Sequence, residues 1–178
     1  MLQVLLGGCG DDDHTDEWVG TWALKMWNGD NYKISGEADF KESWMKQEGG
    51  SMESWDQQVE KFEITAEFTF RNDSRWEFIE IRKLHMTPKW YEMAEKRINR
   101  GDPRGNEVLD TVANYNRDST YISTGSYIVT DDEFIMEGDK RNTVFTGRMS
   151  GLWKRSGSKL TLFGDDKSRS LGTIVLSK

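Results

Sequence analysis

Apolar and polar residues alternate from Glu60 to Phe70, and this period of two predicts a half-buried β-strand. Its apolar positions are Phe62, Ile64, Ala66, Phe68 and Phe70. The turn residues Asn72-Asp73-Ser74 follow, and Arg75 to His85 then predicts the returning strand of a hairpin. Within this return strand the apolar residues change parity between Phe78 and Ile79, which predicts a β-bulge there.

A short pattern occurs twice in succession in the last third of the chain. Gly125-Ser126-Tyr127 and Gly151-Leu152-Trp153 each place a glycine two residues before a large ring, and each is followed by a turn and two apolar residues. Those apolar pairs are Phe134 with Met136, and Leu160 with Leu162. We interpret this as one β-hairpin used twice, followed by a last strand over roughly Ser170 to Ser177. Successive hairpins form a meander, and a long meander removes its edges by closing. The predicted fold is therefore all-β, an antiparallel up-and-down barrel of about eight to nine strands.

One segment between the predicted strands has the pattern of a helix. Thr87-Pro88 supplies an N-cap and a proline at the first helical position, Lys89 to Arg100 follows, and Gly101 ends the run. The predicted apolar stripe consists of Tyr91, Ala94 and Ile98, with Trp90 and Met93 beside it. A second short helix is predicted over Glu107 to Tyr115, so that 87–115 forms a helical insertion. This insertion either covers the barrel mouth or packs on the barrel wall.

The stretch from Asp39 to Gln58 has no clear period. Gly49-Gly50 indicates a turn, and Trp44, Met52 and Trp55 fit either strands or a mobile flap. No element is predicted here.

Composition narrows the class of protein. A chain of 178 residues is large enough for one domain with a substantial core and no disulfides. Its net charge of -7 argues against a nucleic-acid partner, because such binding needs a basic face. The sequence has 17 glycines, eight tryptophans and two prolines, which fits many tight turns around an interior of large rings. No stretch approaches the roughly 20 apolar residues of a transmembrane helix.

The single cysteine, Cys9, ends the run Leu5-Leu6-Gly7-Gly8-Cys9 and precedes Gly10 and the acidic residues 11–13. An apolar run, two small residues, a cysteine and a polar tether together resemble the lipobox of bacterial lipoproteins. The resemblance implies that the Cys9 thiol carries a lipid, which would hold the protein at the bacterial cell envelope, facing the periplasm or the cell exterior. Residues 1–8 are then part of a lipoprotein signal, 9–16 a lipidated tether and 17–178 the folded domain. The alternative is an apolar N-terminal strand or tail that is followed by a cysteine by chance.

The residues Val19-Gly20-Thr21-Trp22 lie at the start of the predicted first strand. A G-x-W at this place in a β-meander resembles the signature of the lipocalins and their calycin relatives, and the two later glycine-ring hairpins are similar to those of lipocalin-like domains on bacterial lipoproteins. The resemblance covers roughly Glu17 to Lys178 and implies that Gly20 and Trp22 close the barrel floor. It also implies a basic residue over the ring of Trp22, for which Arg148 and Arg169 are candidates by order along the chain.

Few residues have the spacing that catalysis or metal binding requires. The two histidines, His14 and His85, lie far apart and have no cysteine or second histidine at metal-ligand spacing. The chain has neither a nucleophile elbow nor a P-loop. We expect no metal, no cofactor and no catalytic residue. An isomerase or dehydratase is a third alternative, which would require a buried carboxylate beside His85 or a tyrosine in the barrel.

The aromatic residues of the predicted strands suggest a ligand. A barrel of about eight strands can hold one small molecule, and the candidate cavity residues are Phe62, Phe68, Tyr127, Phe134 and Trp153. The alternative is that these rings fill the barrel. The leading interpretation is a lipid-anchored, lipocalin-like, non-catalytic protein that binds a small hydrophobic ligand. Its alternative is a structural or protein-interaction envelope lipoprotein with a filled barrel and an unknown protein partner.

Overall fold

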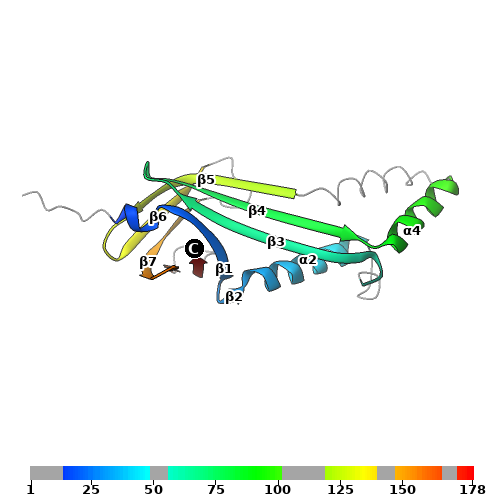
Figure 1. Cartoon of the computed structure of the whole chain (residues 1–178), viewed down its shortest axis with the longest axis horizontal. Coiled ribbons are helices and arrows are strands. Elements are labelled where there is room, and N and C mark those ends of the chain that lie inside the picture. The colour runs from blue at the N-terminus through cyan, green and yellow to red at the C-terminus, as the bar shows by residue number, and fades with distance from the viewer. Residues whose placement is uncertain (1–13, 49–55, 102–118, 140–146, 166–171) are drawn as a thin grey trace, which may run out of the picture.

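A computed structural model describes residues 14–48, 56–101, 119–139, 147–165 and 172–178. Eight antiparallel strands pair in chain order from β1 through β3 to β9, and β9 pairs with β1 to close a barrel (Figure 1). A ninth short strand, β2, pairs with the end of β1. The predicted antiparallel up-and-down barrel is therefore confirmed. The strands are β1 (Gly20–Trp27), β2 (Asp30–Asn31), β3 (Val59–Phe70), β4 (Arg75–Met86), β5 (Ser119–Val129), β6 (Glu133–Gly138), β7 (Arg148–Ser156), β8 (Lys159–Gly164) and β9 (Thr173–Ser177).

The hairpin of β3 and β4 is confirmed, but the bulge predicted inside β4 is wrong. Phe78 lies opposite Phe68 and Ile79 opposite Glu67 without any shift of register. A regular strand keeps every second residue on one face, so the inward face continues from Phe78 to Glu80, which is buried. Ile79 is directed to the other face.

Both predicted C-terminal hairpins are confirmed, as β5 with β6 and β7 with β8. Their glycines are needed because the facing strand passes very close to each one. A Cβ atom on Gly125 would lie 2.0 Å from the carbonyl oxygen of Glu137, and one on Gly151 would lie 1.9 Å from that of Phe163. No side chain fits at either place.

The β5–β6 and β7–β8 hairpins share more features than the sequence pattern indicated. Gly125 pairs with Gly138 and Gly151 with Gly164, at the same separation along the chain. Each second glycine is followed by an aspartate that accepts a hydrogen bond from a hydroxyl of the preceding strand. Thr124 Oγ1 lies 2.6 Å from Asp139 Oδ2, and Ser150 Oγ lies 2.9 Å from Asp165 Oδ2.

The apolar interior is divided into two clusters. The larger one fills the barrel at the end where Trp18 and Trp22 lie, which we call the closed end. It consists of Trp18, Trp22, Leu24, Ala66, Phe68, Phe70, Trp76, Phe78, Tyr127, Val129, Phe134, Met136, Met149, Leu160, Leu162, Ile174 and Leu176. The smaller one lies outside the barrel and consists of Val59, Phe62, Ile64, Leu84, Met86 and Trp90. The burial of Ile174 and Leu176 confirms the predicted last strand as β9.

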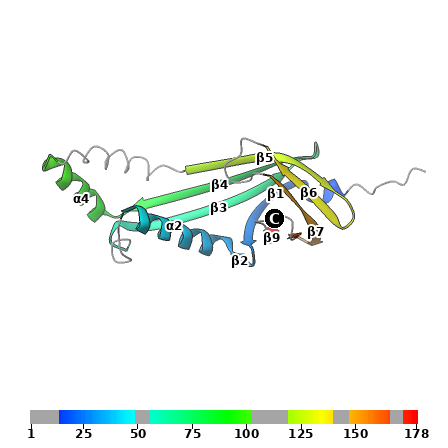
Figure 2. The same cartoon turned by 180° about the vertical axis from the view of Figure 1, so that it is seen from behind.

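The second cluster exists because β3, β4 and β5 extend beyond the barrel at its other end, which we call the open end. β1 pairs only with Glu67–Phe70 of β3, and β6 pairs only with Gly125–Val129 of β5. The remaining parts of β3 and β4, with the beginning of β5, continue past the barrel rim as an extended wall (Figures 1 and 2).

Helix α4 (Pro88–Asn99) confirms the predicted helix, and Thr87 caps it by accepting a hydrogen bond at Oγ1 from the Trp90 amide. Trp90 is buried, whereas Tyr91, a residue of the predicted stripe, is 38% exposed and Ile98 is half-buried, so the buried face includes Trp90 and not Tyr91. The helix lies at the far end of the extended wall, away from the barrel (Figure 2), and thus neither covers the mouth nor packs on the barrel wall. The predicted helix over 107–115 lies outside the described residues.

Helix α2 (Tyr32–Glu48) was not predicted, and it covers the inner face of β3 (Figure 1). Asn31 caps its first turn, accepting the Ile34 amide at Oδ1. Phe40 stacks on Phe62 with 4.3 Å between ring centroids. Gly36 allows the close approach, because a Cβ atom there would lie 2.9 Å from Ile64 Cδ1.

Candidate site at the open end of the barrel

Polar side chains gather on the inner face where the barrel gives way to the extended wall. They come from three elements and consist of Tyr32 of α2, Glu80 and Arg82 of β4, and Tyr121 and Ser123 of β5. Tyr121 lies opposite Glu80, and Ser119 lies opposite Arg82, so the two strands place these residues on one face. We call this set the open-end cluster.

Glu80 is the centre of the open-end cluster. Its side chain is 2% exposed, although an isolated buried carboxylate is very unfavourable. Two partners compensate for the burial. Arg82 Nε donates to Oε1 at 2.6 Å, and the Tyr32 hydroxyl donates to Oε2.

Tyr32 joins α2 to the barrel. Its ring packs against both apolar clusters and lies 6.1 Å, centroid to centroid, from that of Trp27. Burial, followed by the hydrogen bond to the Glu80 carboxylate, raises the pKa of Tyr32 well above its ordinary value. The hydroxyl therefore stays protonated and acts as a donor.

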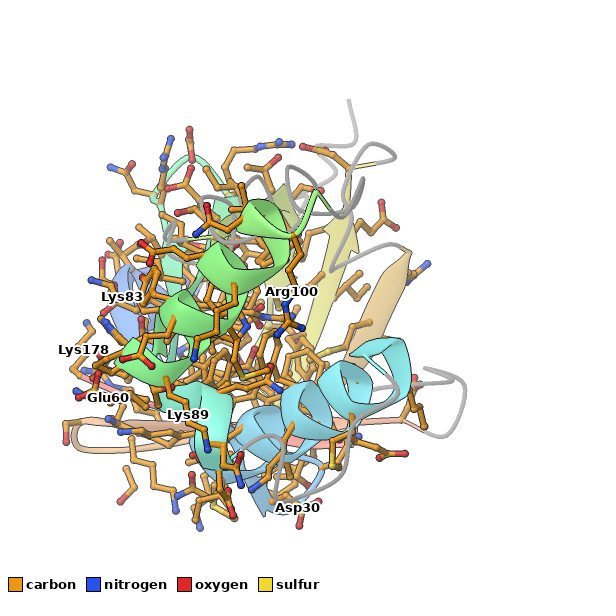
Figure 3. All side chains as sticks on the ribbon, turned by 90° about the vertical axis from the view of Figure 1, so that its right-hand side faces the viewer. Asp30, Glu60, Lys83, Lys89, Arg100 and Lys178 are labelled. Carbon is orange, nitrogen blue, oxygen red and sulfur yellow. The ribbon has the colours of Figure 1, made fainter. Side chains whose placement is uncertain are left out.

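Arg82 and Tyr121 are where the open-end cluster meets solvent. The Arg82 side chain is 36% exposed, and its guanidinium carbon lies 4.8 Å from the centroid of the half-buried Tyr121 ring. An arginine fixed at Nε and resting on an aromatic face has little freedom left. Figure 3 looks along the molecule from the α4 end and shows α4 and α2 nearest the viewer, with the barrel strands behind them.

These residues were missed because the parity change in β4 was read as a bulge. Trp76, Phe78, Leu84 and Met86 are all buried and share one parity, which includes Glu80 and Arg82. That shared parity could have identified Glu80 and Arg82 as residues of the inward face.

The closed end contains the G-x-W motif. Gly20 has a φ of +123°, a conformation that favours glycine, and the Trp22 side chain is fully buried. Trp22 Nε1 donates to the carbonyl oxygen of Trp18 at 2.6 Å.

Two basic side chains lie over the Trp22 ring, and neither is the expected Arg148. Lys178 Nζ is 4.5 Å from the ring centroid and Arg155 Cζ is 5.7 Å from it. Arg148 instead lies 3.9 Å from Glu137, and Arg169 lies outside the described residues. The terminal lysine reaches this place because β9 ends at the barrel floor, where its Nζ donates to the Val19 carbonyl oxygen at 2.9 Å.

The five candidate cavity residues are not all brought together. Phe68, Tyr127 and Phe134 are buried in the closed end, with Trp153 packed against them, whereas Phe62 belongs to the second cluster. The ring of Trp18, from α1 (Thr15–Trp18), lies among the closed-end rings and stacks on Tyr127 at 5.8 Å. That these residues line a ligand cavity stays a prediction.

The N-terminal end of the described chain is held at the closed end. His14 contacts two carboxylates, Glu17 Oε1 at 2.9 Å from Nδ1 and Asp131 Oδ1 at 3.0 Å from Nε2. Hydrogen bonding, first to Glu17 and then to Asp131, raises the pKa of His14. Cys9 lies outside the described residues.

The described part of the chain shows no group of three or more histidine, cysteine or acidic side chains placed to hold a metal ion. None of the helices in this part is long and apolar enough to cross a membrane.

Comparisons with family models, with curated proteins and with solved structures found no match to this chain.

Proposed function

We propose that this chain is a lipocalin-like, non-catalytic binding protein, anchored at the bacterial cell envelope through Cys9, whose small hydrophobic ligand binds at the open end of the barrel. The observation that carries the proposal is the open-end cluster, a polar group that reaches solvent at Arg82 and Tyr121 between two apolar clusters. Pockets that combine apolar lining with a few placed polar groups are typical of small-molecule sites.

The packing of the closed end favours the open end as the place of binding. Trp18 has its ring centroid 5.0 Å from Phe70 and 5.7 Å from Phe134. Phe70 lies 5.2 Å from Tyr127. Aromatic rings at these separations contact one another, so the protein's own side chains occupy this part of the barrel.

The direction of the chain fits an anchor that leaves the open end accessible. His14 lies at the closed end beside Asp131, and it is the fifth residue after Cys9. Five residues span at most about 17 Å. A lipid on Cys9 would therefore hold the closed end near the membrane and direct the open end and α4 away from it.

A catalytic role is less well supported by the same geometry. Glu80 and Tyr32 are a buried carboxylate beside a tyrosine, which is the arrangement that an enzyme of this fold would need. General acid-base catalysis requires a proton or a lone pair directed at the substrate. Here the Tyr32 proton is donated to Glu80, and the other oxygen of Glu80 accepts from Arg82. Both groups are used within the protein, which supports a binding site over a catalytic one.

Ligand binding is tested with the neutral apolar probe N-phenyl-1-naphthylamine, whose fluorescence rises in an apolar site. Ser119 and Ser126 both belong to β5 and are both half-buried, but their odd and even positions place them on opposite faces of the strand. Ser119→Trp should fill the open end and weaken probe binding at least about tenfold, whereas Ser126→Trp should leave it unchanged. Equal binding by both variants would remove the open end as the site.

The anchor is tested by detergent partitioning of the full-length protein with a complete lipoprotein signal. The wild type should enter the detergent phase, and Cys9→Ser should remain in the aqueous phase. Partitioning that does not change on substitution would contradict the lipid anchor.

A second candidate function is a structural or protein-interaction role. It is favoured by large apolar side chains on the outer face of the barrel, namely Ile122, Ile128, Leu152 and Phe163, which are between 43% and 62% exposed. Leu152 and Phe163 are direct cross-strand neighbours. This role would be supported if the wild type bound no probe and if Leu152→Ser with Phe163→Ser abolished a cross-linked envelope complex.

A further inference from the structure

Arg82 uses only one of its N–H groups to bind Glu80. The guanidinium has five N–H donors, and Glu80 takes the one on Nε. Among the residues that the structure describes, neither terminal nitrogen of Arg82 has a hydrogen-bond acceptor. The side chain is 36% exposed, so this edge of the guanidinium is open to solvent.

Tyr121 provides a second uncommitted donor at the same place. Its ring supports the guanidinium of Arg82 at 4.8 Å, and its hydroxyl has no partner within the described ranges. The hydroxyl is not a buried unsatisfied group, because Trp18 Nε1 is the one buried side-chain polar atom of the described residues without a partner. Two donors therefore face solvent from one side of the open-end cluster.

The charge balance directs these donors toward an anion. Glu80 is 2% exposed and lies behind Arg82, so a ligand that arrives from solvent meets the guanidinium first. The Tyr32 hydroxyl shares the charge of Glu80, which leaves Arg82 less fully neutralised. A guanidinium edge with two parallel N–H groups matches the two oxygens of a carboxylate, sulfonate or phosphate.

The arginine is also held in place before any ligand arrives. Fixing Nε against Glu80 and one face against Tyr121 removes most of the rotamer freedom that a long side chain would lose on binding. The net charge of -7 of the whole chain opposes a large polyanion. These constraints fit a single anionic group attached to an apolar body.

We propose that the ligand is an anionic amphiphile, whose oxyanion binds the terminal nitrogens of Arg82 and the Tyr121 hydroxyl while its apolar body lies against the neighbouring clusters. This inference rests on the binding function proposed above and adds the chemical class of the ligand. Glu80 and Tyr32 act as positioning residues, since they hold Arg82 and do not contact the ligand.

The test compares two fluorescent probes that share a scaffold. The probe 1-anilinonaphthalene-8-sulfonate carries a sulfonate, and N-phenyl-1-naphthylamine does not. Glu80→Gln combined with Arg82→Gln removes both charges without leaving a buried carboxylate unpaired. We expect this variant to lower the affinity for the anionic probe at least about tenfold more than it lowers the affinity for the neutral probe.

Two further variants act as controls. Arg75 is another ion-paired arginine of β4, but it pairs with Asp139 at 2.7 Å, away from the open-end cluster. Arg75→Gln should change the affinity for neither probe. Tyr121→Phe keeps the supporting ring and removes one donor, and it should weaken binding of the anionic probe about threefold more than binding of the neutral probe. This milder variant keeps the test valid if the double variant does not fold.

The outcomes separate the two proposals. If the wild type binds neither probe, both the binding function and this inference are overturned. If it binds both and the variants change neither affinity, the anionic head group is overturned while the binding function stands. Inorganic phosphate at millimolar concentration should not displace the anionic probe, and displacement would overturn the requirement for an apolar body.

Discussion

Truncation of Trp22 tests the arrangement of the barrel floor most directly. Its side chain is fully buried, and Lys178 and Arg155 cover its ring. Trp22→Ala should cost about 3–5 kcal/mol, the range for large aromatic truncations in cores. The Trp18 carbonyl oxygen also loses its donor at 2.6 Å, which places the expected cost in the upper half of that range.

Urea unfolding of the purified Cys9→Ser protein, followed by tryptophan fluorescence and circular dichroism, measures this cost. With an m-value of about 2 kcal/mol/M, a loss of about 4 kcal/mol lowers the unfolding midpoint by about 2 M. Trp22→Phe keeps a ring and loses the hydrogen bond, so it should cost about 1–2 kcal/mol.

Ile128→Ala is the matched control, because this apolar residue belongs to the same barrel but is 62% exposed. Its substitution should change the free energy of unfolding by no more than about 0.5 kcal/mol. If Trp22→Ala cost no more than Ile128→Ala, the reasoning that makes Trp22 the floor of the barrel would be refuted.

Three further predictions concern close approach, the buried carboxylate and pH. Gly125→Ala should destabilise the barrel by about 1–3 kcal/mol in the same urea assay, because the new Cβ would lie 2.0 Å from a carbonyl oxygen of β6. Tyr32→Phe should cost about 1.5–3 kcal/mol, because Glu80 loses a hydrogen bond to a charged group, and an unchanged midpoint would contradict this contact. In NMR titrations the pKa of His14 should lie above 6.5 and fall in Glu17→Gln. Because this folded-state pKa is raised, the stabilising contribution of His14 is present below the unfolded value and is lost as pH rises through the folded value; a titration at the ordinary value would contradict the contact.

The period of two and the turn residues were enough to predict the meander. In a half-buried strand, apolar and polar side chains alternate along the sequence. This alternation was enough to predict the hairpins of β3–β4, β5–β6 and β7–β8. The helix α4 was also readable, because Thr87, Pro88 and Gly101 are local signals at its ends. Each of these elements is determined by residues close together in the chain.

Other features depended on contacts between distant segments. Helix α2 presents a narrow face through Tyr32, Gly36 and Phe40, and it is stabilised by packing on β3 more than by its own pattern. Trp90 is buried in α4 because it packs into the second cluster, and the sequence did not predict this cluster.

The sequence by itself determined the strand order and the G-x-W at the start of the first strand, because alternation and turn chemistry are local properties. The tertiary structure decided which charges gather at the site. Glu80 is acceptable on an inward face only because Tyr32, 48 residues away, and Arg82 satisfy it. Lys178 covers Trp22 because barrel closure brings β9 beside β1. Such pairings depend on closure of the whole sheet, and no local pattern encodes them.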